Sequence, residues 1–401
     1  MLDVDKIRLD FPILQTGIIY MDSATSSLTP QPVLTKMMEF YQEYRANVDR
    51  GVHRLSRTAS NEYDLAHRKV AEFVNAKSEE EIIMTRNTTE GLNIVANGLR
   101  WSKGDKVVTT MIDHHSNFIV WQRLRQRHGV SLDVVRPNEQ GLFDLGDFEK
   151  AIDDSTRLVA LPHVSNSLGA IAPVRDIVAI AARRGALTVI DGAQSAPHMK
   201  VDMKEIGCDF FAFSGHKMCG PTGSGTVYIR GELTEELEPT FVGGGTIRDV
   251  SATDYELTSG WHRFEAGTPA IADGIGFGRA ADYLRDLGIQ NIRDHEIALG
   301  KTLYERLTEI PKVRVYGPED IKNRVALVLF NIGDANPDDV AHALDVSKKI
   351  MVRSGHHCAL PTMKEIIHAN GAVRASLYIY NTKEEVELFL STVEELARRI
   401  A

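Results

Sequence analysis

The middle of this chain alternates short apolar runs with segments of helical periodicity, and this alternation constrains the fold more than any other feature. The apolar runs lie at residues 106–110, 157–161, 186–190 and 210–213, and residues 174–182 carry the period of a helix. Strands that alternate with helices indicate a mostly parallel sheet covered by helices on both faces. In sheets of this kind, ligands bind beyond the carboxyl ends of the strands.

The length and the later part of the chain predict a second, smaller unit. With 401 residues and 43% hydrophobic content, the chain exceeds the usual size of one domain. Beyond residue 270 the pattern changes to a long amphipathic stretch, further apolar runs and a final helix from Lys383. We therefore predict an α/β protein with an N-terminal segment that packs with the small domain, a large domain and a small C-terminal domain, at residues 1–20, 21–275 and 276–401.

A lysine follows closely after the end of one apolar run. Residues 210–213 are followed by Ser214, Gly215, His216 and Lys217, which places the amine just beyond the carboxyl end of a buried strand. Neighbouring hydroxyl and imidazole donors, with several glycines that follow, suit a phosphate at this position. Taken alone, Lys217 has the plainer interpretation of a solvated surface lysine after a strand.

A second strand ends in a carboxylate. Asp191 follows the run at 186–190 and lies 26 residues before Lys217, which predicts a connection of helix length between the two strands. A pyridoxal phosphate (PLP) enzyme needs a lysine for the aldehyde and a carboxylate that keeps the pyridine nitrogen protonated. Asp191 alone could also be a helix N-cap.

Polar residues at other element ends complete this set. An imidazole such as His114 can stack on a pyridine ring, and an amide such as Asn166 can reach its phenolic oxygen. Thr88 and Thr89 precede a helical segment, where free N–H groups attract a phosphate. Each has a plainer interpretation, either as a loop residue with a local hydrogen bond or, for Thr89, as an N-cap.

Ten short motifs follow one another along the chain, at residues 20–24, 86–91, 114–117, 164–169, 191–194, 213–223, 243–245, 264–269, 353–359 and 374–376. In sequence and order they resemble those of the class V aminotransferase family of fold-type I PLP enzymes, and within it the cysteine desulfurases of the SufS/CsdA type. The resemblance implies a large domain with a mostly parallel seven-stranded sheet and a smaller α/β C-terminal domain.

The resemblance implies a role for each matching residue. Lys217 binds the cofactor aldehyde, His114 stacks on the pyridine ring and Asp191 holds its nitrogen. Asn166 and Gln194 contact the phenolic oxygen. The residues implied for the phosphate are Thr88, Thr89, Ser214, His216 and, across the interface of a homodimer, Thr268.

The chain has three cysteines, and one of them lies in a setting that favours reactivity. A glycine and two histidines precede Cys358, and these give mobility and favour a thiolate. The segment also resembles the persulfide-carrying segment of the SufS/CsdA group. Cys208 is expected to be a small buried hydrophobe. Cys219 replaces a bulky family residue and is either inert or a second thiol near the cofactor.

The implied reaction converts L-cysteine to L-alanine. Lys217 removes the Cα proton, His114 moves protons, and the Cys358 thiolate takes the substrate sulfur as a persulfide. Guanidinium groups suit a planar carboxylate, although each arginine alone is also a common surface ion-pair partner. The implied substrate-binding residues are Arg374, Arg353, Asn166 and His356.

Some positions depart from the family pattern. Asp49 stands where the family usually has a histidine before Arg-Gly, and Ala270 stands where it often has an asparagine. Asp49 would change the charge near the expected cleft mouth. These differences leave open another sulfur or selenium substrate, or drift at tolerant positions.

Composition and charge narrow the functional classes and partners that this chain can have. A net charge of −9 and a pI near 5.9 argue against a nucleic-acid partner. The first residues do not resemble a signal peptide, no run approaches a membrane span, and the scattered cysteines offer no metal set. We expect a cytoplasmic cysteine desulfurase that passes sulfur to an acceptor protein for Fe–S cluster assembly. The alternatives are another class V enzyme, such as a selenocysteine lyase, cysteine sulfinate lyase or C–S lyase, and a scaffold without catalysis.

Overall fold

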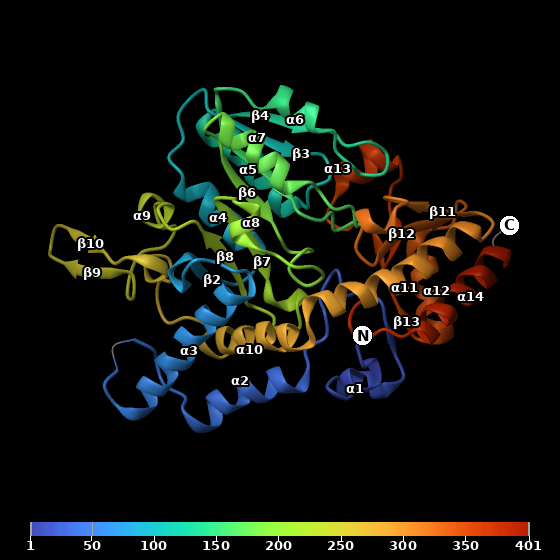
Figure 1. Cartoon of the computed structure of the whole chain (residues 1–401), viewed down its shortest axis with the longest axis horizontal. Coiled ribbons are helices and arrows are strands. Elements are labelled where there is room, and N and C mark those ends of the chain that lie inside the picture. The colour runs from blue at the N-terminus through green and yellow to red at the C-terminus, as the bar shows by residue number, and fades with distance from the viewer. Residues whose placement is uncertain (1, 50, 400–401) are drawn as a thin grey trace.

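A computed structural model describes residues 2–49 and 51–399 of the chain. Within this part, a seven-stranded sheet runs in the order β2-β8-β7-β6-β5-β3-β4 (Figure 1). Strand β8 is antiparallel to both neighbours, and the other pairs are parallel. The predicted mostly parallel sheet is therefore confirmed. Its strands are β2 (Ile82–Thr85), β3 (Lys106–Thr110), β4 (Ser131–Val135), β5 (Thr156–Pro162), β6 (Leu187–Asp191), β7 (Phe210–Ser214) and β8 (Gly225–Ile229).

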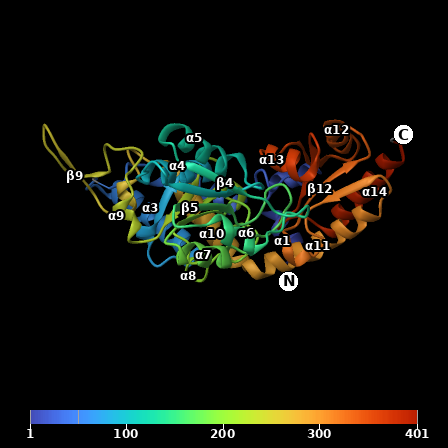
Figure 2. The same cartoon turned by 90° about the horizontal axis from the view of Figure 1, so that it is seen from above.

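Helices cover both faces of this sheet, which explains why its strands are continuous apolar runs rather than alternating ones. Figure 2 shows α4 and α5 on one face and α6, α7 and α8 on the other. In β7, Phe211 and Phe213 belong to one core cluster, whereas Phe210 and Ala212 belong to the other. These helices are α4 (Thr88–Gly98), α5 (Ile119–His128), α6 (Leu145–Ala151), α7 (Val174–Arg183) and α8 (Met203–Ile206).

The connection between β6 and β7 is long enough for a helix, as predicted, but little of it is helical. Its one α-helix among the described residues, α8, has four residues, and the rest consists of turn, bend and irregular residues. Small residues after Asp191 let the chain pass close over the sheet, since a Cβ on Gly192 would lie 2.1 Å from the ring of Phe211. Pro197 also has no N–H to offer a helix. A span of helical length therefore folds as a tight connection.

A second, antiparallel sheet follows in the order β11-β12-β15-β14. Helices α11 (Ile289–Glu309), α12 (Pro337–Lys348) and α14 (Lys383–Arg399) pack around it. The N-terminal strand β1 pairs in parallel with β13 next to this part of the chain. The strands are β1 (Ile19–Tyr20), β11 (Val313–Tyr316), β12 (Leu327–Ile332), β13 (Ile350–Met351), β14 (Arg353–Gly355) and β15 (Ala372–Ser376).

The two sheets are linked by α10 (Ile271–Leu287), which packs on α2 (Gln31–Glu43) and α3 (Arg54–Phe73). The predicted domain boundary after residue 275 lies inside α10, and the domain limits stay a prediction. The remaining named elements include a hairpin that projects at one end in Figure 1. They are α1 (Val4–Leu9), α9 (Leu233–Glu236), β9 (Ile247–Val250), β10 (Tyr255–Leu257) and α13 (Leu360–Thr362).

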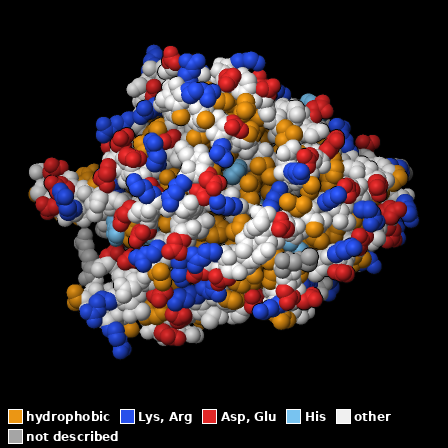
Figure 3. Space-filling model, in the orientation of Figure 1, with side chains coloured by type: hydrophobic (Ala, Val, Ile, Leu, Met, Phe, Trp, Pro, Cys, Tyr) orange, Lys and Arg blue, Asp and Glu red, His pale blue; other side chains and the backbone are white. Residues whose placement is uncertain are grey.

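The surface gives two further observations. Acidic and basic side chains are interspersed over the face that Figure 3 presents. Among the described helices, none combines the length and the apolar character needed to span a lipid bilayer.

Candidate active site

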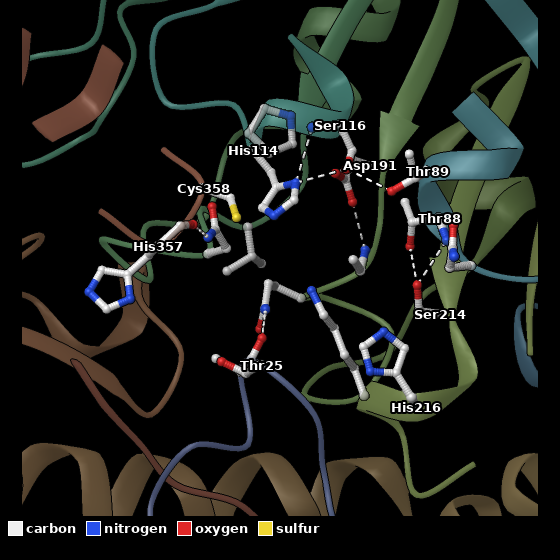
Figure 4. Close-up of a pocket in the computed structure, with 18 of the residues that line it drawn as sticks. Thr25, Thr88, Thr89, His114, Ser116, Asp191, Ser214, His216, His357 and Cys358 are labelled. Carbon is white, nitrogen blue, oxygen red and sulfur yellow. Dashed lines mark hydrogen bonds between the residues drawn. The ribbon is translucent and has the colours of Figure 1, made fainter. Parts of the chain in front are cut away.

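The carboxyl ends of four parallel strands meet at one edge of the large sheet. Because β3, β5, β6 and β7 run in the same direction, the residues that follow them converge there. They line a cavity of about 250 Å³ that also receives residues from the second sheet (Figure 4). The predicted site residues that line it are Thr88, Thr89, His114, Asn166, Asp191, Gln194, Ser214, His216, Lys217, Arg353, Cys358 and Arg374.

Lys217 ends a short 3-10 turn, Gly215–Lys217, that directly follows β7. Its amine lies in the cavity, so it is not the solvated surface lysine of the alternative interpretation. Burial lowers the pKa of Lys217 to about 8, because the loss of solvent outweighs the attraction of Asp191. A larger share of this amine is therefore neutral and nucleophilic near pH 7 than for an ordinary lysine.

Asp191 is the last residue of β6 and is 6% exposed. One carboxylate oxygen accepts a hydrogen bond from the N–H of Ala193 at 3.0 Å. The next helix begins only at Met203 and is capped by Asp202, so Asp191 is not a helix N-cap. Burial raises the pKa of Asp191, against the opposing effects of the Ala193 N–H and Lys217. A buried carboxylate in this position is well suited to a cationic partner in the cavity.

His114 is fixed by Ser116, a contact that sequence reasoning missed. The ring Nδ1 accepts from the Ser116 N–H at 3.1 Å and lies 3.0 Å from the Ser116 hydroxyl oxygen. The neutral ring therefore carries its proton on Nε2. Burial, together with the charge of Lys217, lowers the pKa of His114 to about 3. The imidazole is thus neutral and held in one orientation.

The N-terminus of α4 forms the opposite wall of the cavity. Asn87 caps the helix by accepting from the Glu90 N–H at 3.0 Å, so the interpretation of Thr89 as the cap is wrong. The Thr88 N–H donates to the Ser214 hydroxyl oxygen at 2.8 Å, and their hydroxyl groups are 2.6 Å apart. This leaves a helix N-terminus with hydroxyl groups facing the cavity, which favours an anion.

Two amide side chains in the cavity wall have buried oxygens without a hydrogen-bond partner in the described structure. Asn166 donates through Nδ2 to the His357 carbonyl at 2.7 Å, and Gln194 donates through Nε2 to the Ala24 carbonyl at 2.6 Å. The Oδ1 atom of Asn166 and the Oε1 atom of Gln194 have no such contact. Since buried polar atoms are nearly always paired, these two indicate a polar ligand in the cavity.

Two guanidinium groups face the cavity from the second sheet. Arg374 on β15 is 2% exposed and donates to the Asn166 carbonyl at 2.7 Å and the Thr25 hydroxyl at 2.7 Å. Arg353 on β14 also donates to the Thr25 hydroxyl, at 3.2 Å. Asp22 accepts from both Thr25 and Arg374. The Thr25 hydroxyl thus contacts both guanidinium groups, whereas Asp22 pairs with Arg374 alone, which leaves positive charge for an anionic ligand.

Cys358 lies on the loop after β14, and its sulfur points into the cavity on the side of His114 (Figure 4). Its thiol is free and partly exposed. His357 and Cys358 both have left-handed backbone, with φ of +52° and +54°. This conformation costs about 1–2 kcal/mol per residue without glycine, so contacts outside the loop must hold it. His356 is exposed and bonds the Cys358 N–H through Nδ1 at 3.1 Å, and it does not line the cavity.

Several other predicted positions lie outside this cavity. Thr268 lines a neighbouring cavity of about 300 Å³, and Ala270 lines the same one. Asp49 lies 4.0 Å from His262 rather than in the cavity wall. Whether Thr268 reaches a partner subunit remains a prediction.

The other two cysteines are both core residues. Cys208 is 1% exposed, as predicted, and Cys219 is fully buried in the same hydrophobic cluster. Burial raises the pKa of both thiols, which keeps them protonated. Because Cys219 does not line the cavity, the structure favours an inert role for it.

Sequence reasoning missed four residues that line the cavity or bind its lining residues: Asp22, Thr25, Ser116 and His357. Ser116 and His357 lie beside His114 and Cys358 in the motifs at 114–117 and 353–359, and Asp22 lies in the motif at 20–24. Asp22 and Thr25 reach Arg374 only in the folded chain. No spacing along the sequence indicates that contact.

Known proteins resemble this chain over its whole length. The family described as Aminotransferase class-V matches residues 19–389. A protein of Pyrococcus abyssi named probable cysteine desulfurase is 47% identical over 399 residues, covering 99% of this chain and 98% of that protein. The apo structure of a cysteine desulfurase from Thermococcus onnurineus NA1 matches with a TM-score of 0.96 at 47% identity, covering 100% of this chain and 99% of that chain.

A solved structure with lower sequence identity has the same fold. The cysteine desulfurase CsdA from Escherichia coli has a TM-score of 0.92 at 30% identity, covering 100% of this chain and 99% of that chain. These matches confirm the family and the fold that the ordered motifs predicted. The chain belongs to the class V aminotransferase family.

Proposed function

We propose that this protein is a PLP-dependent cysteine desulfurase that converts L-cysteine to L-alanine and retains the sulfur on Cys358. The observation that carries the proposal is the presence of the Lys217 amine and the Cys358 thiol in the walls of one cavity. The predicted activity is confirmed by relatives of that name at 39–47% identity over nearly the full chain.

The residues of the cavity fit PLP. Lys217 would hold the aldehyde, Asp191 the pyridine nitrogen and the N-terminus of α4 the phosphate, with His114 against the ring. Thr89, Ser214 and His216 would add phosphate contacts, and the unpartnered oxygens of Asn166 and Gln194 mark further polar positions. When bound, PLP withdraws electrons from the substrate Cα and thereby makes its proton removable.

Lys217 then moves the proton at the substrate Cα. Its neutral form can accept that proton, and its lowered pKa keeps this form accessible near neutral pH. Arg374 and Arg353 hold the substrate carboxylate, because Asp22 pairs with Arg374 alone and the two guanidinium groups together keep net positive charge. His114 is neutral and can pass a proton through Nε2.

Cys358 receives the sulfur. Its thiolate attacks the substrate sulfur, a new S–S bond forms and the substrate C–S bond breaks. The electron pair of the broken bond stays with the carbon fragment, which gains a proton and leaves as alanine. The persulfide of Cys358 then passes its terminal sulfur to a thiol acceptor.

Our proposals for the oligomeric state, the cellular location and the sulfur acceptor rest on the family resemblance. We propose a cytoplasmic homodimer in which Thr268 of each subunit reaches the phosphate of the other, and a protein acceptor that serves Fe–S cluster assembly. The position of Thr268 outside the cavity of its own chain is consistent with such an exchange. We expect no nucleic-acid or membrane partner.

The test is a single turnover of the yellow, cofactor-loaded protein with L-cysteine, followed by intact-mass analysis with and without reductant. We expect a gain of one sulfur that reductant removes and that maps to Cys358, with about one alanine per site. Alanine without a sulfur adduct would instead identify another lyase of the class. Absence of both the yellow colour and alanine would favour a scaffold.

The rate at which the cofactor-free protein takes up PLP should rise with pH around a midpoint near 8. Burial lowers the pKa of Lys217 to about 8, and only the neutral amine attacks the aldehyde. About one tenth of the amine is neutral at pH 7 and about nine tenths at pH 9, so the rate should increase roughly tenfold. Stopped-flow absorbance measures this rate.

Pyridoxine phosphate is the matched control, because it has the phosphate and ring but no aldehyde. Its binding should not follow the Lys217 midpoint. A PLP uptake rate that stays constant from pH 6 to 9 would contradict the assignment of Lys217.

A further inference from the structure

His115 makes two hydrogen bonds to the loop that carries the reactive thiol. Its backbone N–H donates to the Cys358 carbonyl at 2.7 Å, and its ring Nε2 accepts from the Leu360 N–H at 3.1 Å. One residue thus holds the loop on both sides of Ala359. The ring is half-buried and lies 5.6 Å, between centroids, from the ring of His356 on the same loop.

The backbone conformation of this loop requires stabilising contacts from residues outside the loop. His357 and Cys358 both have left-handed backbone, which residues with a Cβ rarely adopt without support. Before the thiol, Asn166 bonds the His357 carbonyl and the His357 ring contacts the Ala372 carbonyl. Beyond the thiol, His115 makes the contacts nearest to it, and the Thr362 hydroxyl donates to the Met111 carbonyl further along. The chain also turns at Gly355, with φ of +101°, so the loop has a flexible entry.

The ring contact defines how His115 can act. Because Nε2 accepts a backbone N–H, the proton of the neutral ring lies on Nδ1. The ring then has no lone pair left for the Cys358 thiol, which excludes it as the base that deprotonates that thiol. Burial and the neighbouring His356 lower the pKa of His115, so the ring stays in the neutral form that accepts the bond.

We propose that the His115 ring is a positioning residue for sulfur transfer, which holds Cys358 against the cavity through the Leu360 N–H. The proposal rests on the proposed function, because it assigns His115 a part in the step in which Cys358 takes the substrate sulfur. His115 touches neither substrate nor cofactor in this role. Its neighbour His114, which does line the cavity, has a separate task.

The test compares His115→Gln with His115→Asn. The glutamine Oε1 can occupy the place of the ring Nε2 and accept from Leu360, whereas the asparagine Oδ1 is too short. Losing one such hydrogen bond should slow persulfide formation about threefold to tenfold in His115→Asn, with KM for L-cysteine unchanged. His115→Gln should remain near the wild-type rate. His115→Ala replaces the asparagine variant if that protein does not fold.

A second readout does not depend on turnover. Alkylation of Cys358 by iodoacetamide, followed by peptide mass analysis, should be faster in His115→Asn than in the wild type or His115→Gln. The same exchanges at His128, which is exposed at the end of α5, provide the matched control and should change neither readout.

The outcomes separate the two claims. If the asparagine and glutamine variants behave alike, whether both are normal or both are impaired, the positioning role is wrong. If the wild type forms no persulfide, the proposed function fails, and the alkylation rates alone then decide whether His115 holds the loop.

Discussion

Replacement of Lys217 by alanine should lower the rate of alanine formation from L-cysteine by about a thousandfold or more. The variant loses both the amine that holds the cofactor aldehyde and the base that takes the Cα proton. No other amine lines the described cavity, so no neighbouring lysine can replace it. The measurement is alanine release under saturating PLP, with absorbance recorded to follow the cofactor.

Two further observations make this prediction specific to the amine. A small primary amine such as methylamine, added to Lys217→Ala, should restore part of the activity because it can supply the missing base. Lys103→Ala, at an exposed position, should retain wild-type activity. If Lys217→Ala kept more than a tenth of the activity, the role of Lys217 in proton transfer would be refuted.

Replacement of Cys358 by alanine should abolish sulfur transfer from L-cysteine, with a loss of about a thousandfold or more. The substrate sulfur then has no nucleophile in the cavity, because Cys208 and Cys219 are buried in the core and do not line it. Alanine and protein-bound sulfur measured in one turnover give the result. Cys208→Ala is the matched control and should retain turnover.

The same variant distinguishes the desulfurase from its alternative. Assays with L-cysteine, selenocysteine and cysteine sulfinate should show that only the L-cysteine reaction requires the Cys358 thiol. Cysteine turnover by Cys358→Ala at the wild-type rate would instead favour a lyase that expels sulfur without a persulfide.

Most of the large sheet and its edge could be predicted from the sequence. Strands β3, β6 and β7 agree with apolar runs to within a residue at each end, and β5 gains one residue at each end. Their position at the strand ends predicts that His114, Asn166, Asp191 and Lys217 lie close together, and all four line one cavity. The reason is local, because parallel strands with both faces buried must be apolar throughout and their carboxyl ends meet at one edge.

The conformation of the connection after β6 could not be predicted in this way. The segment has the length of a crossover helix, but close packing over Phe211 and the proline at 197 decide its shape. The cap of α4 is similar, since Asn87, Thr88 and Thr89 all suit an N-terminus and only the backbone path selects Asn87. Such choices depend on packing that residue types alone do not specify.

The parallel sheet and the strand-end amine, carboxylate and imidazole can be predicted from periodicity and from residues next to one another in the chain, and the family from the resemblance of its ordered motifs. The contacts by which Thr25 joins Arg353 to Arg374 and His115 holds the Cys358 loop form only when the chain folds. These contacts join distant segments and use backbone groups that every residue carries. The sequence pattern therefore indicates neither which residues make these contacts nor how far apart they are along the chain.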